Sequence, residues 1–247
     1  ELKLLVDSIQ SSKFITARKS NELIRKLESL CSEYEAKKLQ RQVYVSGRIK
    51  TMNESIYYNV DSIHNAITEN KKIMFQYFQW NLKKEMELRH NGEMYHISPW
   101  GLSWNDENYY LVGYDSDDQM IKHYRVDKML KIRMSDEPRE GKKYFEKFDI
   151  GTYSRKNFSM FGGKEERVRL LMDNQMAGVV IDRFGKDVSM VPVDDNHFSI
   201  SVDVVVSQQF FGWVFALGKG VKIIGPESVV QQVNQEIKRL VEQYNME

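Results

Sequence analysis

S-P-W-G-L-S-W-N-D-E-N-Y-Y-L-V-G-Y-D-S-D-D-Q-M-I-K-H-Y-R-V-D-K-M-L-K-I-R-M, residues 98–134, is the stretch that decides the fold. Runs of aromatic and branched residues, which are typical of strands, occur at 102–104, 109–114 and 120–127. Polar runs with the composition of tight turns separate them, at 105–108 and 115–118. With further strand patterns upstream, beginning at 72–80, we expect five or six short antiparallel strands between residues 72 and 134, as in a small barrel.

Alternation along the last of these strands sorts its side chains onto two faces. One face is expected to carry Lys122, Tyr124 and Val126, and the other His123, Arg125 and Asp127. Three ionisable groups would then lie side by side on an aromatic-rich sheet. This arrangement suits an anionic or nucleotide-like ligand better than it suits catalysis.

Size and composition exclude several classes of protein. The chain has 247 residues, enough for one or two domains and an extra helical segment. Its net charge is +1, from 36 basic and 35 acidic residues, so bulk charge does not favour a histone-like or membrane-coating protein. Cys31 is the single cysteine, which excludes an intramolecular disulfide and fits a cytoplasmic location. No apolar run approaches the roughly 20 residues of a membrane helix, so we expect no membrane partner.

Residues 1–69 are predicted to be a helical arm. Apolar residues recur at helical spacing over 1–10, 20–31 and 54–69, with Thr16 or Ser20 as the cap of the second helix. Two interpretations compete for the first forty residues: a helix–turn–helix that binds DNA, and a helical linker or dimerisation segment. The second is favoured, because a DNA-reading unit needs three compact helices. The apolar stripes have no domain around them, so we expect a homodimer.

The last hundred residues show a clear order of elements. A polar segment at 136–147 contains Pro138 and Gly141 and is predicted to be a linker. Strand and helix patterns then follow in the order β-α-β-β-α-β, with a terminal helix, within residues 148–247. This order predicts a ferredoxin-like sandwich. The whole chain is therefore expected to be of the α+β class.

No motif in the sequence indicates catalysis. The chain has no H-E-x-x-H, no paired-cysteine zinc spacing, no G-x-S-x-G and no phosphate-binding glycine loop. A metal site made by His96 and His123 would require adjacent strands, and solvated or hydrogen-bonded histidines are far commoner. We therefore predict no enzyme, no metal and no cofactor.

Several motifs resemble the WYL domain of bacterial transcriptional regulators. The naming tripeptide is similar to Tyr109-Tyr110-Leu111, and the proline and aromatic residue before it to Pro99-Trp100. The R-x-F-R-L-D-R-I run of that family is similar to 122–129, with lysine in place of arginine at 122 and 128, which removes two bidentate donors. Downstream, S-R-K-N-F-S-M-F-G-G and W-V-F-A-L-G-K-G resemble the WCX extension that follows WYL domains.

The resemblance implies a fold and a function. Residues 70–135 would form an SH3- or Sm-like barrel that senses a nucleotide or a single-stranded nucleic acid. The first 16 residues resemble the segment after a winged helix–turn–helix, so the DNA-binding domain would lie upstream and be missing here. The predicted pocket consists of Arg125, His123, Asp127, Tyr110, Ser98, His96, Trp100, Lys122 and Lys128.

Two alternatives stay open. Arg125 would have a purely structural role if it paired with Asp127 or another acid while the tyrosines only packed. The whole chain would instead be a stand-alone Sm-like module if it bound single-stranded nucleic acid without a small effector.

Overall fold

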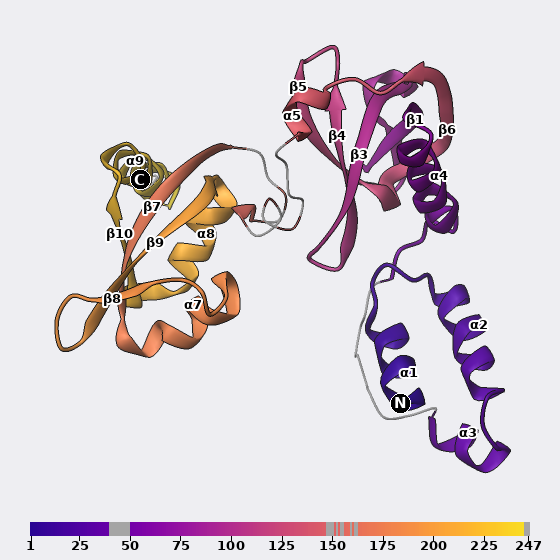
Figure 1. The fold of residues 1–247 in the computed structure, drawn as a ribbon, viewed down its shortest axis with the longest axis horizontal. Helices are drawn as coiled ribbons and strands as arrows, with labels where there is room; N and C mark the ends of the chain where they lie inside the picture. The colour runs from indigo at the N-terminus through magenta and orange to yellow at the C-terminus, as the bar shows by residue number, and fades with distance from the viewer. Residues whose placement is uncertain are drawn as a thin grey trace. The chain divides into compact units, whose positions relative to one another are not determined.

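The structure, a computed structural model, describes residues 1–39, 50–146, 151, 153, 156–158, 160 and 163–244 (Figure 1). Helices and antiparallel sheets are combined, which confirms the predicted α+β class. The chain divides into two units, Glu1–Phe148 and Asp149–Glu247. Within the described ranges, no helix is both long and apolar enough to cross a membrane.

The first unit begins with the helices α1 (Leu2–Ser11), α2 (Ala17–Glu28) and α3 (Glu33–Leu39). The hydroxyl Oγ1 of Thr16 caps α2 by accepting a hydrogen bond of 3.2 Å from the backbone N–H of Lys19. A small apolar cluster joins this segment: Val6 and Ile24 are buried, and Leu2, Ile9, Leu27 and Cys31 pack around them. The predicted helices at 1–10 and 20–31 are therefore present, with the second shifted towards the N-terminus.

A six-stranded antiparallel sheet follows. Its strands are β1 (Lys71–Trp80), β2 (Met86–Leu88), β3 (Tyr95–Asn105), β4 (Asn108–Asp115), β5 (Met120–Arg125) and β6 (Met129–Pro138). The strand order is β2-β1-β3-β4-β5, and β6 pairs with β1. Two 3₁₀ turns, η1 (Arg89–Gly92) and η2 (Val126–Lys128), connect β2 to β3 and β5 to β6. The strands and turns predicted within 98–134 are present, except that the strand predicted over 120–127 ends at Arg125 and Val126–Lys128 form the 3₁₀ turn η2.

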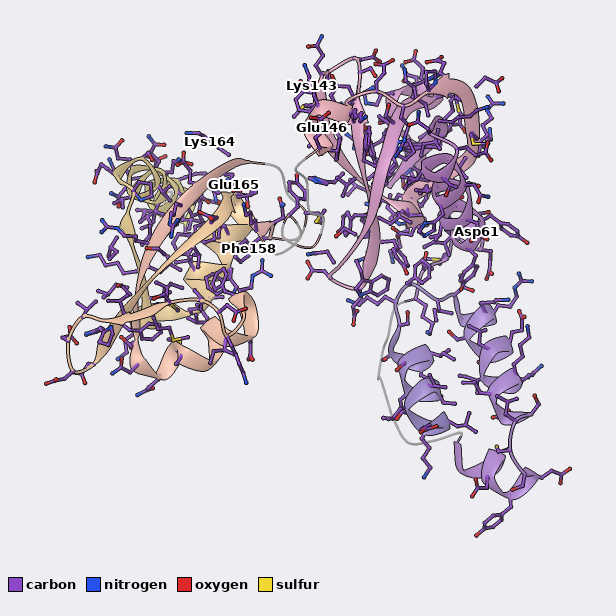
Figure 2. The ribbon with its side chains drawn as sticks, viewed as in Figure 1. Asp61, Lys143, Glu146, Phe158, Lys164 and Glu165 are labelled. Atoms are coloured by element: carbon purple, nitrogen blue, oxygen red, sulfur yellow. The ribbon has the colours of Figure 1, made fainter. Side chains whose placement is uncertain are left out.

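Helix α4 (Ile56–Thr68) belongs to this barrel rather than to the N-terminal arm. Its residues Ile56, Ile63 and Ala66 are at most 1% exposed and share one core with Ile73, Phe75, Tyr77, Ile97, Leu111, Tyr124, Val126 and Met129. The exposed Asp61 marks its outer side (Figure 2). The expected boundary at residue 69 is therefore displaced, because an amphipathic helix closes the core that the strands leave open.

The segment 136–147, predicted as a linker, is folded onto the barrel as far as residue 146. Strand β6 continues to Pro138, and the short helix α5 spans Lys142–Phe145. Lys72, with 9% of its side chain exposed, lies 2.9 Å from a carboxylate oxygen of Glu137 and 2.7 Å from one of Glu140. We call residues 136–146 the strap. Most of its residues are exposed to solvent, but Glu137 and Glu140 also pair with the largely buried Lys72.

The second unit is the expected ferredoxin-like sandwich. Its elements are β7 (Lys164–Asp173), η3 (Asn174–Met176), α7 (Ala177–Phe184), β8 (Met190–Pro192), β9 (His197–Val206), α8 (Gln208–Ala216), η4 (Gly218–Gly220), β10 (Val221–Gly225) and α9 (Glu227–Tyr244). The antiparallel strand order is β10-β7-β9-β8, so the two β-α-β halves interleave. Phe158, labelled in Figure 2, lies in the core of this unit, where its ring centroid is 5.3 Å from that of Phe210.

Candidate ligand-binding pocket

Arg125 is the central charged residue of the predicted site, at the end of β5. Its Nε and Nη2 donate to the two carboxylate oxygens of Asp127 at 3.0 and 2.8 Å, and Nη2 also donates to Asn108 Oδ1 at 2.9 Å. The expected pairing with Asp127 is therefore present. The remaining nitrogen, Nη1, makes no hydrogen bond within the part of the chain that the structure describes. An anion can therefore approach Arg125 without displacing Asp127.

The turn η2 that carries Asp127 is held by two asparagines. Asn53 Nδ2 donates to the backbone oxygens of Asp127 and Met129, and the buried Asn59 Nδ2 donates to those of Val126 and Met129, all at 2.9–3.2 Å. The backbone N–H of Arg125 donates to Tyr77 Oη at 3.0 Å. Burial raises the pKa of Tyr77 to about 12, so this hydroxyl stays neutral. These bonds orient the Arg125–Asp127 pair before any ligand arrives.

A cavity of about 460 Å³ opens beside this pair. Its lining is Lys13, Lys50, Thr51, Met52, Asn53, Glu54, Phe78, Trp80, Met86, Asn108, Arg125, Asp127 and Leu130. Phe78 is buried, whereas Trp80 is 43% exposed and stands edge-on to it at 5.5 Å. A volume of this size is within the range of pockets for small ligands. We call it the arginine pocket.

Lys128, also predicted for the site, follows Asp127 in η2 but does not line the arginine pocket. Burial is the main cause that lowers its pKa, the charges of Arg125 and Arg89 lower it further, and Asp127 raises it. The lining of the pocket carries three cations, Lys13, Lys50 and Arg125, and two carboxylates, Glu54 and Asp127. This balance of charge suits an anion.

Four predicted residues lie elsewhere. Ser98 and Trp100 bind the strap through Glu140. Ser98 Oγ accepts a hydrogen bond from the backbone N–H of Glu140 at 2.9 Å, and Trp100 Nε1 donates to the backbone carbonyl of Glu140 at 2.8 Å. His96 and Lys122 line a separate cavity of about 250 Å³ together with Asp115, Asp117 and Asp118. Sequence position near strand ends grouped these residues, but His96, Ser98 and Trp100 lie on β3 and Lys122 lies on β5.

Lys122 is paired with two carboxylates. Its Nζ lies 2.8 Å from Asp115 Oδ2 and is also bonded to Asp118. Burial acts to lower the pKa of Lys122, but these two bonds outweigh burial and raise it. The cavity around it is acidic, so it does not favour an anion.

Tyr110 and His123 lie close to the pocket in the sheet without lining it. Tyr110 is the register partner of Arg125 across β4 and β5, and burial raises its pKa. His123 is mostly buried, and burial lowers its pKa to about 4, so the ring is neutral at pH 7. The strand of His123 is separated from that of His96 by β4. Across the described residues, no group of three His, Cys, Asp or Glu side chains could hold a metal ion.

Of the thirteen residues that line the arginine pocket, the sequence predicted only Arg125 and Asp127. Lys13, Met52 and Glu54 come from the N-terminal part of the chain, and Trp80 and Met86 from the β1–β2 hairpin. The hairpin contribution was detectable, because the turn N-L-K-K places Trp80 opposite Met86 in the register. The contribution of Lys13 had no local signal, because it depends on how the helical segment docks on the barrel.

Comparisons with known proteins place both units in families. The model of the WYL domain matches residues 58–134, and the model of the WCX domain matches residues 164–241. No curated protein matches the chain at a significant level.

Solved structures give weaker similarities. Proteasome accessory factor B/C (PafBC) of Arthrobacter aurescens is 18% identical over 83% of this chain and 29% of that one, with a TM-score of 0.34. A CRISPR Cas-related protein is 12% identical over 94% of this chain and 59% of that one, with a TM-score of 0.44. The chain thus spans less than two thirds of either protein. The two family matches confirm the resemblance stated above: this chain belongs to the proteins that carry a WYL domain followed by a WCX domain.

Proposed function

We propose that this chain is the ligand-sensing region of a transcriptional regulator and that the arginine pocket binds a small nucleotide-like anion. The WYL and WCX domains support a regulatory, ligand-sensing role in general. Both domains also favour a non-enzymatic protein. The finer proposal concerns the ligand class, and it rests on the pocket.

One observation carries this choice of ligand. The same cavity is lined by Arg125, whose Nη1 makes no hydrogen bond among the described residues, and by the aromatic side chains of Phe78 and Trp80. A guanidinium binds a phosphate through short charge-assisted hydrogen bonds. An exposed tryptophan stacks on a base, which contributes about 1–3 kcal/mol. A nucleoside phosphate satisfies both groups at once.

Calorimetric titration of the chain with AMP, GMP, CMP and UMP tests the proposal, with the four nucleosides as controls for the phosphate. We expect at least one monophosphate to bind, and to bind more tightly than its nucleoside. Arg125→Ala should weaken this binding roughly tenfold or more, since a hydrogen bond to a charged group contributes about 1.5–3 kcal/mol. The matched control is Arg133→Ala, which removes an exposed arginine from β6, outside the pocket.

The rival function is a stand-alone module for single-stranded nucleic acid. Exposed Trp80 beside the basic turn residues Lys83 and Lys84 is the observation that favours it. Such a module would bind long single strands tightly, with a steep dependence on salt. Titration of the chain with long single-stranded oligonucleotides tests this function. If these strands bind tightly with a steep dependence on salt and no mononucleotide binds, the sensing proposal is wrong.

The remaining parts of the proposal concern partners. We propose that the regulator works in the cytoplasm, that ligand binding controls DNA binding by a winged helix–turn–helix upstream, and that the chain is a homodimer. Exposed leucines on the helical segment support the dimer, since Leu4 and Leu30 are 70% and 72% exposed. Light scattering at micromolar concentration should give twice the chain mass. A monomer mass for the wild type would exclude the dimer.

A further inference from the structure

One wall of the arginine pocket lies outside both matched domains. The WYL match begins at residue 58, whereas Lys13 and the residues 50–54 line the cavity. These two stretches are fastened to each other, because the backbone N–H of Thr51 donates to the carbonyl of Lys13 at 2.8 Å. The barrel alone therefore does not complete the pocket.

The connector between α1 and α2, residues 12–16, is seated on the barrel. Phe14 packs edge-on against Tyr57 and Trp104, each at 5.8 Å, and against Tyr109 at 4.6 Å. The backbone N–H of Thr16 donates to Tyr57 Oη at 3.3 Å. Tyr109 is the first residue of the tripeptide Tyr109-Tyr110-Leu111, so this part of the WYL domain contacts the helical segment.

Lys50 ties both helices to the pocket wall. Its Nζ donates to the carbonyls of Ile9 and Ser12 at 3.0 and 2.8 Å and to Ser20 Oγ at 2.9 Å. The two carbonyls lie at the C-terminal end of α1, where a cation is favoured by the helix dipole. A change at residues 50–54 therefore reaches α1 and α2 directly.

Lys13 and Arg125 are held over the same turn. Lys13 Nζ lies 3.1 Å from Glu107 Oε2 in the β3–β4 turn, and Arg125 Nη2 donates to Asn108, the next residue and the first of β4. The side chains of Lys13 and Glu107 are 45% and 40% exposed. Exposed ion pairs contribute little, about 0–1 kcal/mol, so a phosphate can draw Lys13 away from Glu107 at low cost.

We propose that Lys13 is a second cationic contact for the phosphate of the ligand, so that ligand binding fastens the α1–α2 segment to the barrel. This inference rests on the proposed function of the arginine pocket. Arg125 and Lys13 approach one anion from the barrel and from the connector. The helical segment then responds to the ligand, because the connector between its helices is part of the binding site.

The test uses the whole chain and the tightest-binding of the four nucleoside monophosphates. Lys13→Ala should weaken binding about tenfold, as expected for one charge-assisted bond, and Lys13→Arg should stay within about threefold of the wild type. Glu107→Gln should tighten binding a fewfold, because it removes the competing carboxylate. The control is Lys26→Ala on α2, whose side chain is 68% exposed and pairs with Glu22.

Hydrogen exchange of the amides in α1 and α2 gives the second measurement. Nucleotide should slow exchange in both helices of the wild type, and should not do so in Lys13→Ala at matched occupancy. Unchanged affinity in Lys13→Ala, with binding still lost in Arg125→Ala, overturns this inference and leaves the proposed function intact. Nucleotide binding without slower exchange in the helices also overturns it. If no monophosphate binds the wild type, the proposed function itself fails.

Discussion

At the scale of the residue, the Arg125–Asp127 pair has both a structural and a binding role, and the two can be separated. Arg125→Ala leaves Asp127, whose side chain is only 16% exposed, without its cation. Breaking such a pair from one side is more destabilising than removing both partners. We predict that Arg125→Ala lowers the free energy of unfolding by about 1–3 kcal/mol. The double variant Arg125→Ala/Asp127→Ala should recover most of that stability but none of the affinity for nucleotide.

Urea denaturation and calorimetry measure the two quantities on the same samples. If the double variant regains binding together with stability, the affinity lost in Arg125→Ala came from misfolding of the turn and not from a missing contact.

His123 makes the barrel sensitive to acid. Burial lowers its pKa from 6.5 to about 4. Between these two pH values the imidazole is protonated in the unfolded chain and neutral in the folded chain. Stability is therefore complete above pH 6.5 and falls as the pH drops towards 4. We predict that the free energy of unfolding of His123→Gln falls less than that of the wild type over this pH window. The two losses should differ by about 2–3 kcal/mol. Denaturation at pH 7 and pH 4.5 measures the difference, and equal losses in both proteins would contradict it.

The sequence predicted Arg125 and Asp127 for a reason that also explains what it missed. Alternation along a strand is a local property, so the pattern of six residues grouped Arg125 with Asp127. Asp127 in fact lies in the turn η2, where the ion pair with Arg125 brings the two side chains together. Lys13 lies in a polar connector whose position depends on Phe14 docking among three aromatic rings of the barrel. Ser98 and Trp100 bond to the strap and do not line the arginine pocket, because a buried serine and a half-buried tryptophan serve a strap as readily as a ligand.

At the scale of the element, the strap shows why composition misled the prediction of a linker. Residues 136–146 are polar, but Glu140 accepts hydrogen bonds from Lys72 at 2.7 Å and from Ser116 at 2.7 Å, and Arg139 stacks on Trp100 at 4.2 Å. The bond to Lys72 is the main cause that lowers the pKa of Glu140. The pattern of charge alone does not reveal that the partners exist, because they lie far away in the sequence.

The strap should stabilise the barrel measurably. We predict that Glu140→Ala lowers the local stability of β1 and β6 by about 1–3 kcal/mol, because Lys72 is largely buried and loses one of its two carboxylates. Hydrogen exchange of the amides of β1 and β6 measures this change. Asp136→Ala is the control. Asp136 is fully exposed, and its substitution removes only one ion pair, in which Lys71 Nζ lies 3.4 Å from Asp136 Oδ1. Equal effects of the two substitutions would show that the strap lies loosely on the sheet.

At the scale of the whole molecule, the second unit was easier to predict than the first. Strict alternation from Phe198 to Val206 and the glycines after α8 mark its elements locally, and the order of strands follows from the β-α-β-β-α-β pattern. The first unit depends on long-range pairing: β6 returns to β1, and α4 closes a core made by strands that follow it. Its curled antiparallel sheet was predicted, but the packing of α4 and of the strap on that sheet was not.

The two units should fold independently, because each has a core of its own. The first buries Ile56, Ile63, Phe75, Leu111 and Met129 around α4, and the second buries Leu170, Met172, Ile200, Val204 and Phe210 between its sheet and helices. Domains with separate cores unfold as separate cooperative units. We predict that residues 1–148 and 149–247, produced apart, each give a cooperative thermal transition by circular dichroism. The first piece should keep the nucleotide affinity of the whole chain within about threefold, since the arginine pocket lies entirely within it. A first piece that folds but loses this affinity would show that the WCX domain completes the site.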